Sequence, residues 1–401
     1  MSDIAVDFRN VDIVFGKRQA EAIQLLDAGH HRGEILERTG CVIGVAGASI
    51  GIERGEICVL MGLSGSGKST LLRAVNGLNK VTRGEVWVDD GQSRTDVAHC
   101  DEQTLRRLRR GKVAMVFQQF ALLPWRTVQE NVGFGLELRG MAKAEREAVV
   151  DEKLKLVRLE QWAGKYGHQL SGGMQQRVGL ARAFATDAEI LLMDEPFSAL
   201  DPLIREHLQD ELLDLQQTVR KTIVFVSHDL DEALKIGTHI AIMEGGRIVQ
   251  YGEPEEIVLN PANEYVADFV AHMNPLKVLT GGSLMTPAER LRSHEGMLVL
   301  DSRGHIRLSL DGAGLPAAIS IDGRPGRIVA YAEDLNLEGL PEGTFVTAPP
   351  DLKMRDAIRL RRAAGTPVLF LEEGRFVGVC GDEEIYGGIL RQTRANETKA
   401  G

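Results

Sequence analysis

The sequence predicts an α/β protein built on a parallel sheet, followed by a smaller α+β domain. Short apolar runs rich in β-branched residues recur between residues 57 and 243, and helical stretches separate them. Runs of roughly four to eight such residues are typical of strands that are buried on both faces of a sheet. A glycine-rich loop directly follows the first run and precedes a helical segment, which is the order found around phosphate-binding loops.

The first part begins with a predicted strand at residues 4–15, where apolar and polar side chains alternate in part. Residues 17–44 form a polar insert with helical propensity, and Gly29 and Gly40 divide it into a predicted helical hairpin. Buried strands are then predicted at 57–61, 113–117, 190–193, 222–226 and 240–243, and helices at 142–157 and 203–219.

A domain boundary is predicted near residue 275, because Asn260-Pro261 and Asn274-Pro275 are turn signals. The second domain is therefore expected at 275–401. Its better-formed half, 345–392, predicts a short strand followed by a helix at 352–364, a hairpin of 367–371 with 376–379, and a last helix at about 382–390. Its earlier half, 284–332, shows one clear hairpin around Ser302-Arg303-Gly304 and only a loose similarity to the later half.

The composition is that of a globular protein with an acidic surplus. The 401 residues are 43% hydrophobic, and 47 Lys and Arg face 57 Asp and Glu, which gives a net charge of −10. An acidic balance argues against a general affinity for nucleic acid or anionic lipid. The basic run at 105–112 lacks interleaved aromatic residues, so we interpret it as a solvated helix face.

The four cysteines are scattered without a CxxC pair, which favours neither a disulfide framework nor a zinc site and fits a reducing cytoplasm. The N-terminus has no secretory pattern, and no stretch of about 18 apolar residues is present. We therefore expect the chain to reach a membrane only by docking.

The strongest motif is a complete GxxxxGK[ST] pattern between a strand and a helix. Glycines let backbone N–H groups turn toward phosphate, the lysine reaches the terminal phosphates, and the serine hydroxyl binds Mg²⁺. A loop that merely turns the chain is the alternative, which this context disfavours. The residues are Gly62, Leu63, Ser64, Gly65, Ser66, Gly67, Lys68 and Ser69, with Thr70 next in the helix.

Two further motifs carry candidate chemistry. The strand at 190–193 ends in Asp194, placed to hold Mg²⁺, and Glu195, placed to orient and deprotonate the attacking water. Ser171, Gly172 and Gly173 open a helix about 20 residues earlier, which makes a second phosphate-facing helix N-terminus. Two such sites are hard to fit on one nucleotide, but a head-to-tail pair of chains would join them across a two-fold axis.

With these motifs in order, residues 1–270 resemble the nucleotide-binding subunit of ABC transporters, and we expect that domain to span 1–274. The resemblance implies a P-loop NTPase core with a helical subdomain at about 119–180, and it implies ATP and Mg²⁺ as cofactors. It makes Phe15 the adenine-stacking residue, Gln118 a Mg²⁺ contact, Asp201 the end of the D-loop and His228 a γ-phosphate contact. The implied catalytic residues are Glu195, His228 and Lys68, and the implied metal residues are Ser69, Gln118 and Asp194.

Within that superfamily, the insert and the surrounding motifs resemble the importer subunits for quaternary amines such as glycine betaine, choline and proline-type osmoprotectants. This resemblance implies a homodimer beneath a membrane permease, which would dock at about 119–138, with a substrate-binding protein outside and no nucleic-acid partner. It also implies a peripheral location on the cytoplasmic face of the bacterial inner membrane. Residues 275–401 weakly resemble a degenerate pair of cystathionine-β-synthase-type (CBS) modules, with a regulatory or a merely dimer-stabilising role.

Two alternatives stay open. One is an importer for another small solute, such as an amino acid, a sulfonate or a polyamine. The other is an ABC ATPase outside transport, which the single cassette and the missing heptad run disfavour.

Overall fold

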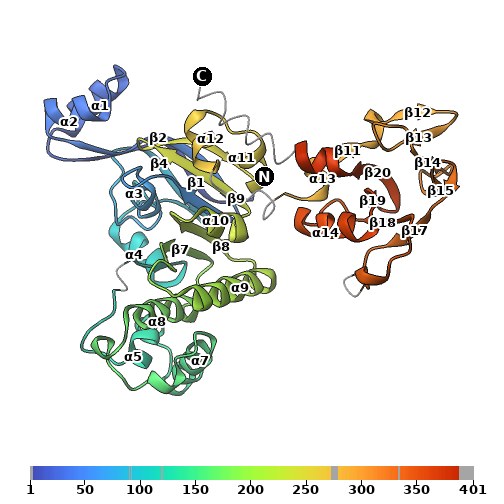
Figure 1. The fold of residues 1–401 in the computed structure, drawn as a ribbon. Coiled ribbons are helices and arrows are strands. Elements are labelled where there is room, and N and C mark those ends of the chain that lie inside the picture. The colour runs from blue at the N-terminus through green and yellow to red at the C-terminus, as the bar shows by residue number, and fades with distance from the viewer. Residues whose placement is uncertain are drawn as a thin grey trace. The chain divides into compact units, whose positions relative to one another are not determined.

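The computed structural model describes residues 3–89, 91, 93–118, 121–271, 279–332 and 335–387. Its contacts divide the chain into two units, Met1–Val266 and Ala267–Gly401, each of which is described by itself (Figure 1). The boundary predicted near residue 275 falls within 272–278, outside the described residues. None of the described helices has the length and apolar composition to cross a membrane.

Two sheets form the first unit. The six-stranded sheet has the order β10-β9-β3-β8-β7-β6, in which β9, β3, β8, β7 and β6 are parallel and β10 is antiparallel to β9. Its strands are β3 (Ile57–Met61), β6 (Val113–Val116), β7 (Ile190–Asp194), β8 (Thr222–Val226), β9 (His239–Glu244) and β10 (Arg247–Gly252). The antiparallel sheet, ordered β2-β1-β4-β5, consists of β1 (Ile4–Phe15), β2 (Val42–Glu53), β4 (Arg83–Asp89) and β5 (Arg94–Asp96).

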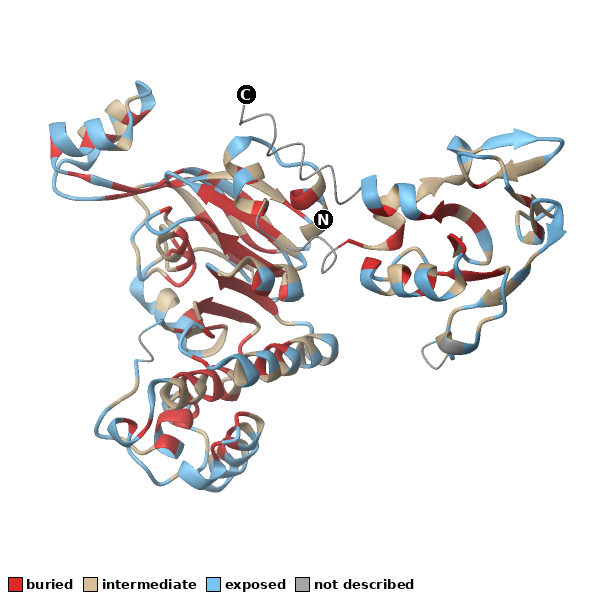
Figure 2. Ribbon diagram, viewed as in Figure 1, coloured by how far each residue is buried: buried red, intermediate tan, exposed pale blue. Residues whose placement is uncertain are grey.

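One hydrophobic core joins the two sheets, since Phe8 of the antiparallel sheet and Leu60, Leu192 and Val226 of the parallel sheet belong to the same buried cluster. Every residue of β3, β7 and β8 is buried, as Figure 2 shows by colour. The continuous apolar runs in the sequence arise from this burial on both faces. The strand prediction at 4–15 and the five predicted buried strands are therefore confirmed, with ends that differ by at most one residue.

The helices of the first unit lie around these sheets and in a separate helical region. The insert forms α1 (Gln19–Asp27) and α2 (Arg32–Thr39), and α2 ends at Gly40 in a left-handed conformation. The others are α3 (Lys68–Leu72), α4 (Glu102–Gly111), α5 (Val128–Val132), α6 (Phe134–Leu138), α7 (Lys143–Leu156), α8 (Gly172–Ala185), α9 (Pro202–Val219), α10 (Leu230–Ile236), α11 (Pro254–Leu259) and α12 (Glu264–Val270). Helices α5 to α8 pack together as the helical region.

The second unit contains a mixed sheet and an antiparallel sheet. The mixed sheet has the order β11-β20-β19-β18-β17, with bounds β11 (Thr286–Pro287), β17 (Arg327–Ala330), β18 (Thr344–Ala348), β19 (Val368–Glu372) and β20 (Arg375–Cys380). The antiparallel sheet runs in chain order through β12 (Arg292–His294), β13 (Met297–Val299), β14 (Ile306–Leu310), β15 (Pro316–Ile321) and β16 (Arg324–Pro325). Helices α13 (Gly281–Leu284) and α14 (Met354–Ala364) complete it. Leu308 and Ile319 share a buried cluster with Phe345 and Leu369, so the two sheets enclose one core.

The two halves of this unit differ in their described residues. The later half has the predicted order of strand, helix and hairpin in β18, α14, β19 and β20, and residues 382–387 begin the predicted last helix. The earlier half contains the predicted hairpin as β13 and β14, but its other described elements are short strands and a 3-10 helix at Ala288–Arg290. The order of strand, helix and hairpin predicted for the later half is thus the part that the structure matches.

Candidate active site

The glycine-rich loop between β3 and α3 is packed so closely that two of its positions require glycine. Gly62 and Gly67 have φ angles of 139° and 103°, in the left-handed region. A Cβ atom at Gly62 would lie 2.1 Å from the carbonyl oxygen of Met243, and one at Gly67 would lie 2.3 Å from that of Gly44. Only glycine lets the loop backbone approach β9 and β2 this closely.

Lys68, the first residue of α3, is buried beneath this loop. Its Nζ donates hydrogen bonds to the carbonyl oxygens of Gly62 at 2.8 Å and Leu63 at 3.0 Å. Burial lowers the pKa of the Lys68 ammonium, while the charges of Glu195 and Asp194 raise it. No carboxylate bonds to Nζ within the described residues, so neutral carbonyl groups hold its charge beside the loop.

Ser69 and Asp194 bring two oxygen ligands together at the end of β7. The Ser69 hydroxyl donates to Asp194 Oδ1 at 2.6 Å, and Arg73 Nη2 donates to Asp194 Oδ2 at 2.9 Å. The Asp194 side chain is fully buried, so the guanidinium of Arg73 offsets the cost of burying its charge. Hydroxyl and carboxylate oxygens are the hard ligands that Mg²⁺ prefers.

Glu195 follows in a strained conformation, with a φ angle of 50°. Gln118 Nε2 donates to Glu195 Oε2 at 3.0 Å, and His228 Nδ1 lies 3.5 Å from the same oxygen. Gln118 comes after β6 and His228 after β8, so the carboxyl ends of parallel strands bring all three side chains together. Non-glycine residues in the left-handed region are uncommon and cluster at functional sites.

Three residues to which the sequence analysis assigned no role also hold this site. Arg73 pairs with Asp194, as above. Gln176 of α8 is buried, donates to the Glu195 carbonyl oxygen at 3.1 Å and accepts from the Ala199 N–H at 3.1 Å. Tyr265 of α12 accepts a hydrogen bond from the N–H of Leu63 at 3.2 Å. Arg73 lies one helical turn after Ser69, which is a sequence signal, whereas Tyr265 is 202 residues from its partner and carries none.

The other predicted residues lie at helix N-termini, at the end of β1, and in or just after the phosphate-binding loop. Ser171 caps α8 by accepting from the Met174 N–H, and Asp201 caps α9 by accepting from the Ile204 N–H. Gly172 is exposed beside Ser171, with Gly173 next to it. Phe15 ends β1 and is 43% exposed, with its ring against Gly44 and close to the start of the insert. Around the loop, Ser64 and Gly65 are exposed, Thr70 is half-buried, and the buried Ser66 hydroxyl has no hydrogen-bond partner among the described residues.

Comparisons with known proteins decide the family. A family model described as ABC transporter matches residues 45–198. The glycine betaine transport ATP-binding protein OpuAA of Bacillus subtilis (strain 168) is 44% identical over 380 residues, which cover 92% of this chain and 88% of that protein. The chain belongs to the ABC transporter ATP-binding proteins.

Other relatives agree with this family. The glycine betaine/carnitine transport ATP-binding protein GbuA of Listeria monocytogenes serotype 1/2a (strain 10403S) is 50% identical over 289 residues, 72% of this chain and 71% of that protein. A solved dimeric structure of the ATP-binding cassette MJ0796 bound to ADP and Pi is 32% identical with a TM-score of 0.54, over 62% of this chain and 98% of that one. The resemblance drawn from the sequence is thereby confirmed.

As an ABC ATPase, this chain hydrolyses ATP with Mg²⁺, and the residues present fit both cofactors. The Lys68 charge and the unpartnered Ser66 hydroxyl are suited to phosphate. No cluster of three His, Cys, Asp or Glu side chains able to hold a metal ion occurs in the described part of the chain. Mg²⁺ commonly takes only one or two protein carboxylates together with phosphate oxygens and water, and Ser69 and Asp194 could provide such a site.

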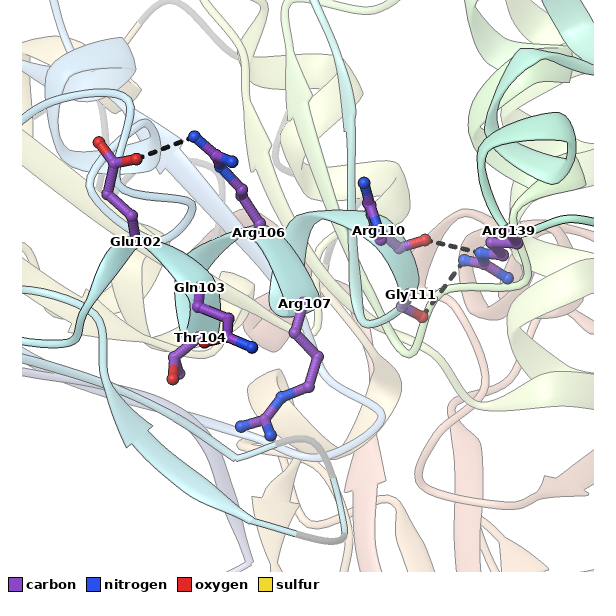
Figure 3. A pocket seen from close by; sticks show the side chains of 8 residues that line it. All are labelled: Glu102, Gln103, Thr104, Arg106, Arg107, Arg110, Gly111 and Arg139. Carbon is purple, nitrogen blue, oxygen red and sulfur yellow. Dashed lines mark hydrogen bonds and ion pairs between the residues drawn. The ribbon is translucent and has the colours of Figure 1, made fainter.

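A separate hollow of about 1020 Å³ lies at α4 and contains none of the predicted site residues. Figure 3 shows its lining side chains, among them Arg106, Arg107 and Arg139. Arg106 pairs with Glu102 at 2.9 Å, and Arg139 donates to the carbonyl oxygens of Arg110 and Gly111. All four arginines of α4 are exposed, whereas Leu108 is buried, so the basic run lies on the solvent-facing side of a helix, as the sequence interpretation expects.

Proposed function

We propose that this chain energises an importer of quaternary amines such as glycine betaine, choline and proline-type osmoprotectants. The observation that supports this substrate class is the 44% identity with a glycine betaine transport ATP-binding protein over 92% of this chain. The alternative cargo classes, an amino acid, a sulfonate or a polyamine, are supported by no comparable match among these relatives.

The proposed roles at the site follow from its contacts. Lys68 and the N–H groups of residues 62–70 bind the ATP phosphates, and Phe15 stacks on adenine. Bound Mg²⁺ would neutralise phosphate charge, and Ser69, Asp194 and Gln118 are the residues that would hold it. Glu195 accepts the proton of the attacking water, while Gln118 and His228 orient its carboxylate through the contacts to Oε2.

The proposed working form is a head-to-tail homodimer. Ser171, Gly172 and Gly173 would then face the phosphate-binding loop of a second copy. Exposed apolar residues support this pairing: Leu63 in the loop is 63% exposed, and Leu203, two residues after Asp201, is 75% exposed. Both side chains would be covered in such a dimer, which removes apolar surface from water.

A permease would dock on residues 119–138, of which 121–138 are described. Buried Asn131 fixes this surface by accepting from the Leu123 N–H and donating to the Leu123, Arg126 and Thr127 carbonyl oxygens. Trp125 is 71% exposed on this fixed segment, so it is available to a partner. Phe120, also expected there, lies outside the described residues. Attachment to a permease would place the chain on the cytoplasmic face of the inner membrane.

The second unit is proposed to be regulatory or dimer-stabilising. The support is the strand, helix and hairpin order of β18 to β20, which is the order expected of one CBS-like module. Pairing of such units between two copies would strengthen the dimer.

One experiment tests the substrate and the role of the tail. The importer, reconstituted in lipid with its permease and binding protein, is assayed for ATP hydrolysis with glycine betaine, choline, proline, histidine and taurine, each at low and high salt. We expect stimulation by glycine betaine or choline. Stimulation only by an unrelated solute would refute the substrate class. A salt dependence that is lost on removing residues 276–401 would support a sensing role, and one that survives would refute it.

A further inference from the structure

The insert is fastened to the body of the first unit. In Figure 1 its two helices lie beyond the ends of β1 and β2. Asp27 at the end of α1 accepts two hydrogen bonds from Arg83 of β4, both at 2.8 Å. Arg83 also donates to the buried Asp12 of β1 at 2.6 Å. The insert also shares a buried hydrophobic cluster with β1 and β2. The members of this cluster are Val14, Ala22, Leu26, Ile35, Cys41, Ile43 and Ala46. Its position is therefore fixed, unlike that of a free surface hairpin.

This fixed insert reaches the phosphate-binding loop through Arg32, the first residue of α2. Arg32 Nη1 donates to the carbonyl oxygen of Gly65 at 3.3 Å, and Nη2 donates to that of Ile43. The two nitrogens of one rigid guanidinium thus join the loop to β2. Arginine suits this task because its planar fork presents several donors in a fixed geometry.

The two carbonyl groups belong to two elements of the proposed nucleotide site, the loop tip and β2. Gly65 stands at the exposed tip of the loop, where a Cβ atom would meet nothing within 4 Å. Ile43 precedes Gly44, where a Cβ atom would lie 2.8 Å from the Phe15 ring and 3.0 Å from Thr70. Since side chains do not pack on the loop tip at Gly65, the hydrogen bond from Arg32 is a direct means of fixing it.

We propose that Arg32 is a positioning residue of the ATP site, which clamps the tip of the phosphate-binding loop to β2 and adds a fixed positive charge beside the bound triphosphate. This inference rests on the proposed nucleotide site. It gives the insert a part in nucleotide binding. The clamp acts equally before and during hydrolysis, so its loss weakens binding without slowing the chemical step.

The test measures ATP binding and hydrolysis by full-length Arg32→Ala and Arg32→Lys. We expect Arg32→Ala to raise KM for MgATP about tenfold with kcat changed less than about twofold, because a charge-assisted hydrogen bond is lost. A fluorescent ATP analogue should show the same loss of affinity at equilibrium. Arg32→Lys should fall between Ala and wild type, since an ammonium keeps the charge but cannot span both carbonyl groups.

Arg18→Ala is the matched control, because Arg18 is an insert arginine that bonds to Glu21 and the Arg38 carbonyl oxygen within the insert. It should leave KM unchanged. An equal rise in KM in Arg18→Ala would attribute the effect to folding of the insert and overturn the proposal. An unchanged KM in Arg32→Ala, or a fall in kcat alone, would also overturn it. If the wild-type chain hydrolyses ATP in the same assay, these failures leave the proposed function intact.

Discussion

Replacing Glu195 by glutamine removes the proposed general base and little else. The amide has the shape of the carboxylate, and its oxygen still accepts the hydrogen bond that Gln118 donates at 3.0 Å. It cannot accept a proton from water. The side chain of Glu195 is only partly buried and its ion-pair contact with His228 is 3.5 Å long, so little folding energy depends on its charge.

The expected loss of ATP hydrolysis in Glu195→Gln is about 10²- to 10⁴-fold, the usual contribution of a positioned base. This corresponds to roughly 2.7–5.4 kcal/mol of activation free energy, at about 1.36 kcal/mol for each tenfold. Phosphate release at saturating MgATP gives the rate, and a fluorescent ATP analogue gives the affinity, which should survive. Size-exclusion chromatography with ATP should show the proposed head-to-tail dimer accumulating, because bound ATP is no longer hydrolysed. The melting temperature should stay within about 2 °C of wild type.

Glu189→Gln is the control for this prediction, because Glu189 precedes β7 at its opposite end and pairs with Lys112 at 3.0 Å. Its hydrolysis rate should stay within about twofold of wild type. A Glu195→Gln enzyme that keeps more than about a tenth of the wild-type turnover would refute the assignment of the base. Loss of ATP affinity together with activity would show instead that Glu195 supports binding.

Three further predictions concern the same unit. Lys68→Ala should weaken ATP affinity itself, measured with the fluorescent analogue, because the cation under the loop is lost; wild-type affinity would refute its phosphate role. Gly62→Ala should lower the free energy of unfolding by more than about 1 kcal/mol in urea titrations, since its Cβ would strike the Met243 carbonyl oxygen, whereas Gly65→Ala, with open space around it, should cost less. Burial raises the pKa of Glu232 above its ordinary 4.5, so the folded state disfavours the charged form. The stability advantage of Glu232→Gln over wild type should therefore grow from about pH 4 to about pH 7, and an advantage independent of pH would contradict this.

The strands of the parallel sheet and the main motifs were predictable because each is a pattern of contiguous residues. The strand 57–61 and the loop after it need no distant information. The meeting of Gln118, Glu195 and His228 followed from a family resemblance, and the carboxyl ends of parallel strands produce it physically. The residues that sequence reasoning missed act across long separations, as Gln176 and Tyr265 do.

The antiparallel sheet of the second unit was mostly missed for a different reason. Its strands β12 and β16 have only three and two residues, and none of those residues is buried. Short exposed strands carry no apolar run or sustained alternation for a pattern to detect. Only β13 and β14 were predictable, since a turn signal and apolar residues on both sides mark that hairpin.

The two hydrogen bonds of Gln176 connect helix α8 to the backbone at Glu195 and Ala199. The Gln176 side chain donates to the carbonyl oxygen of Glu195 and accepts from the N–H of Ala199. Gly172, at the start of the helix, lies about 6 Å from Gln176 along the helix axis. In a head-to-tail pair, that start would complete the neighbouring copy's proposed nucleotide pocket, while Gln176 stays bonded to the backbone carbonyl oxygen of the chain's own Glu195. A shift of the backbone at Glu195 would then move the start of α8 and so change the pocket of the other copy. The state of one proposed pocket would therefore affect the geometry of the other.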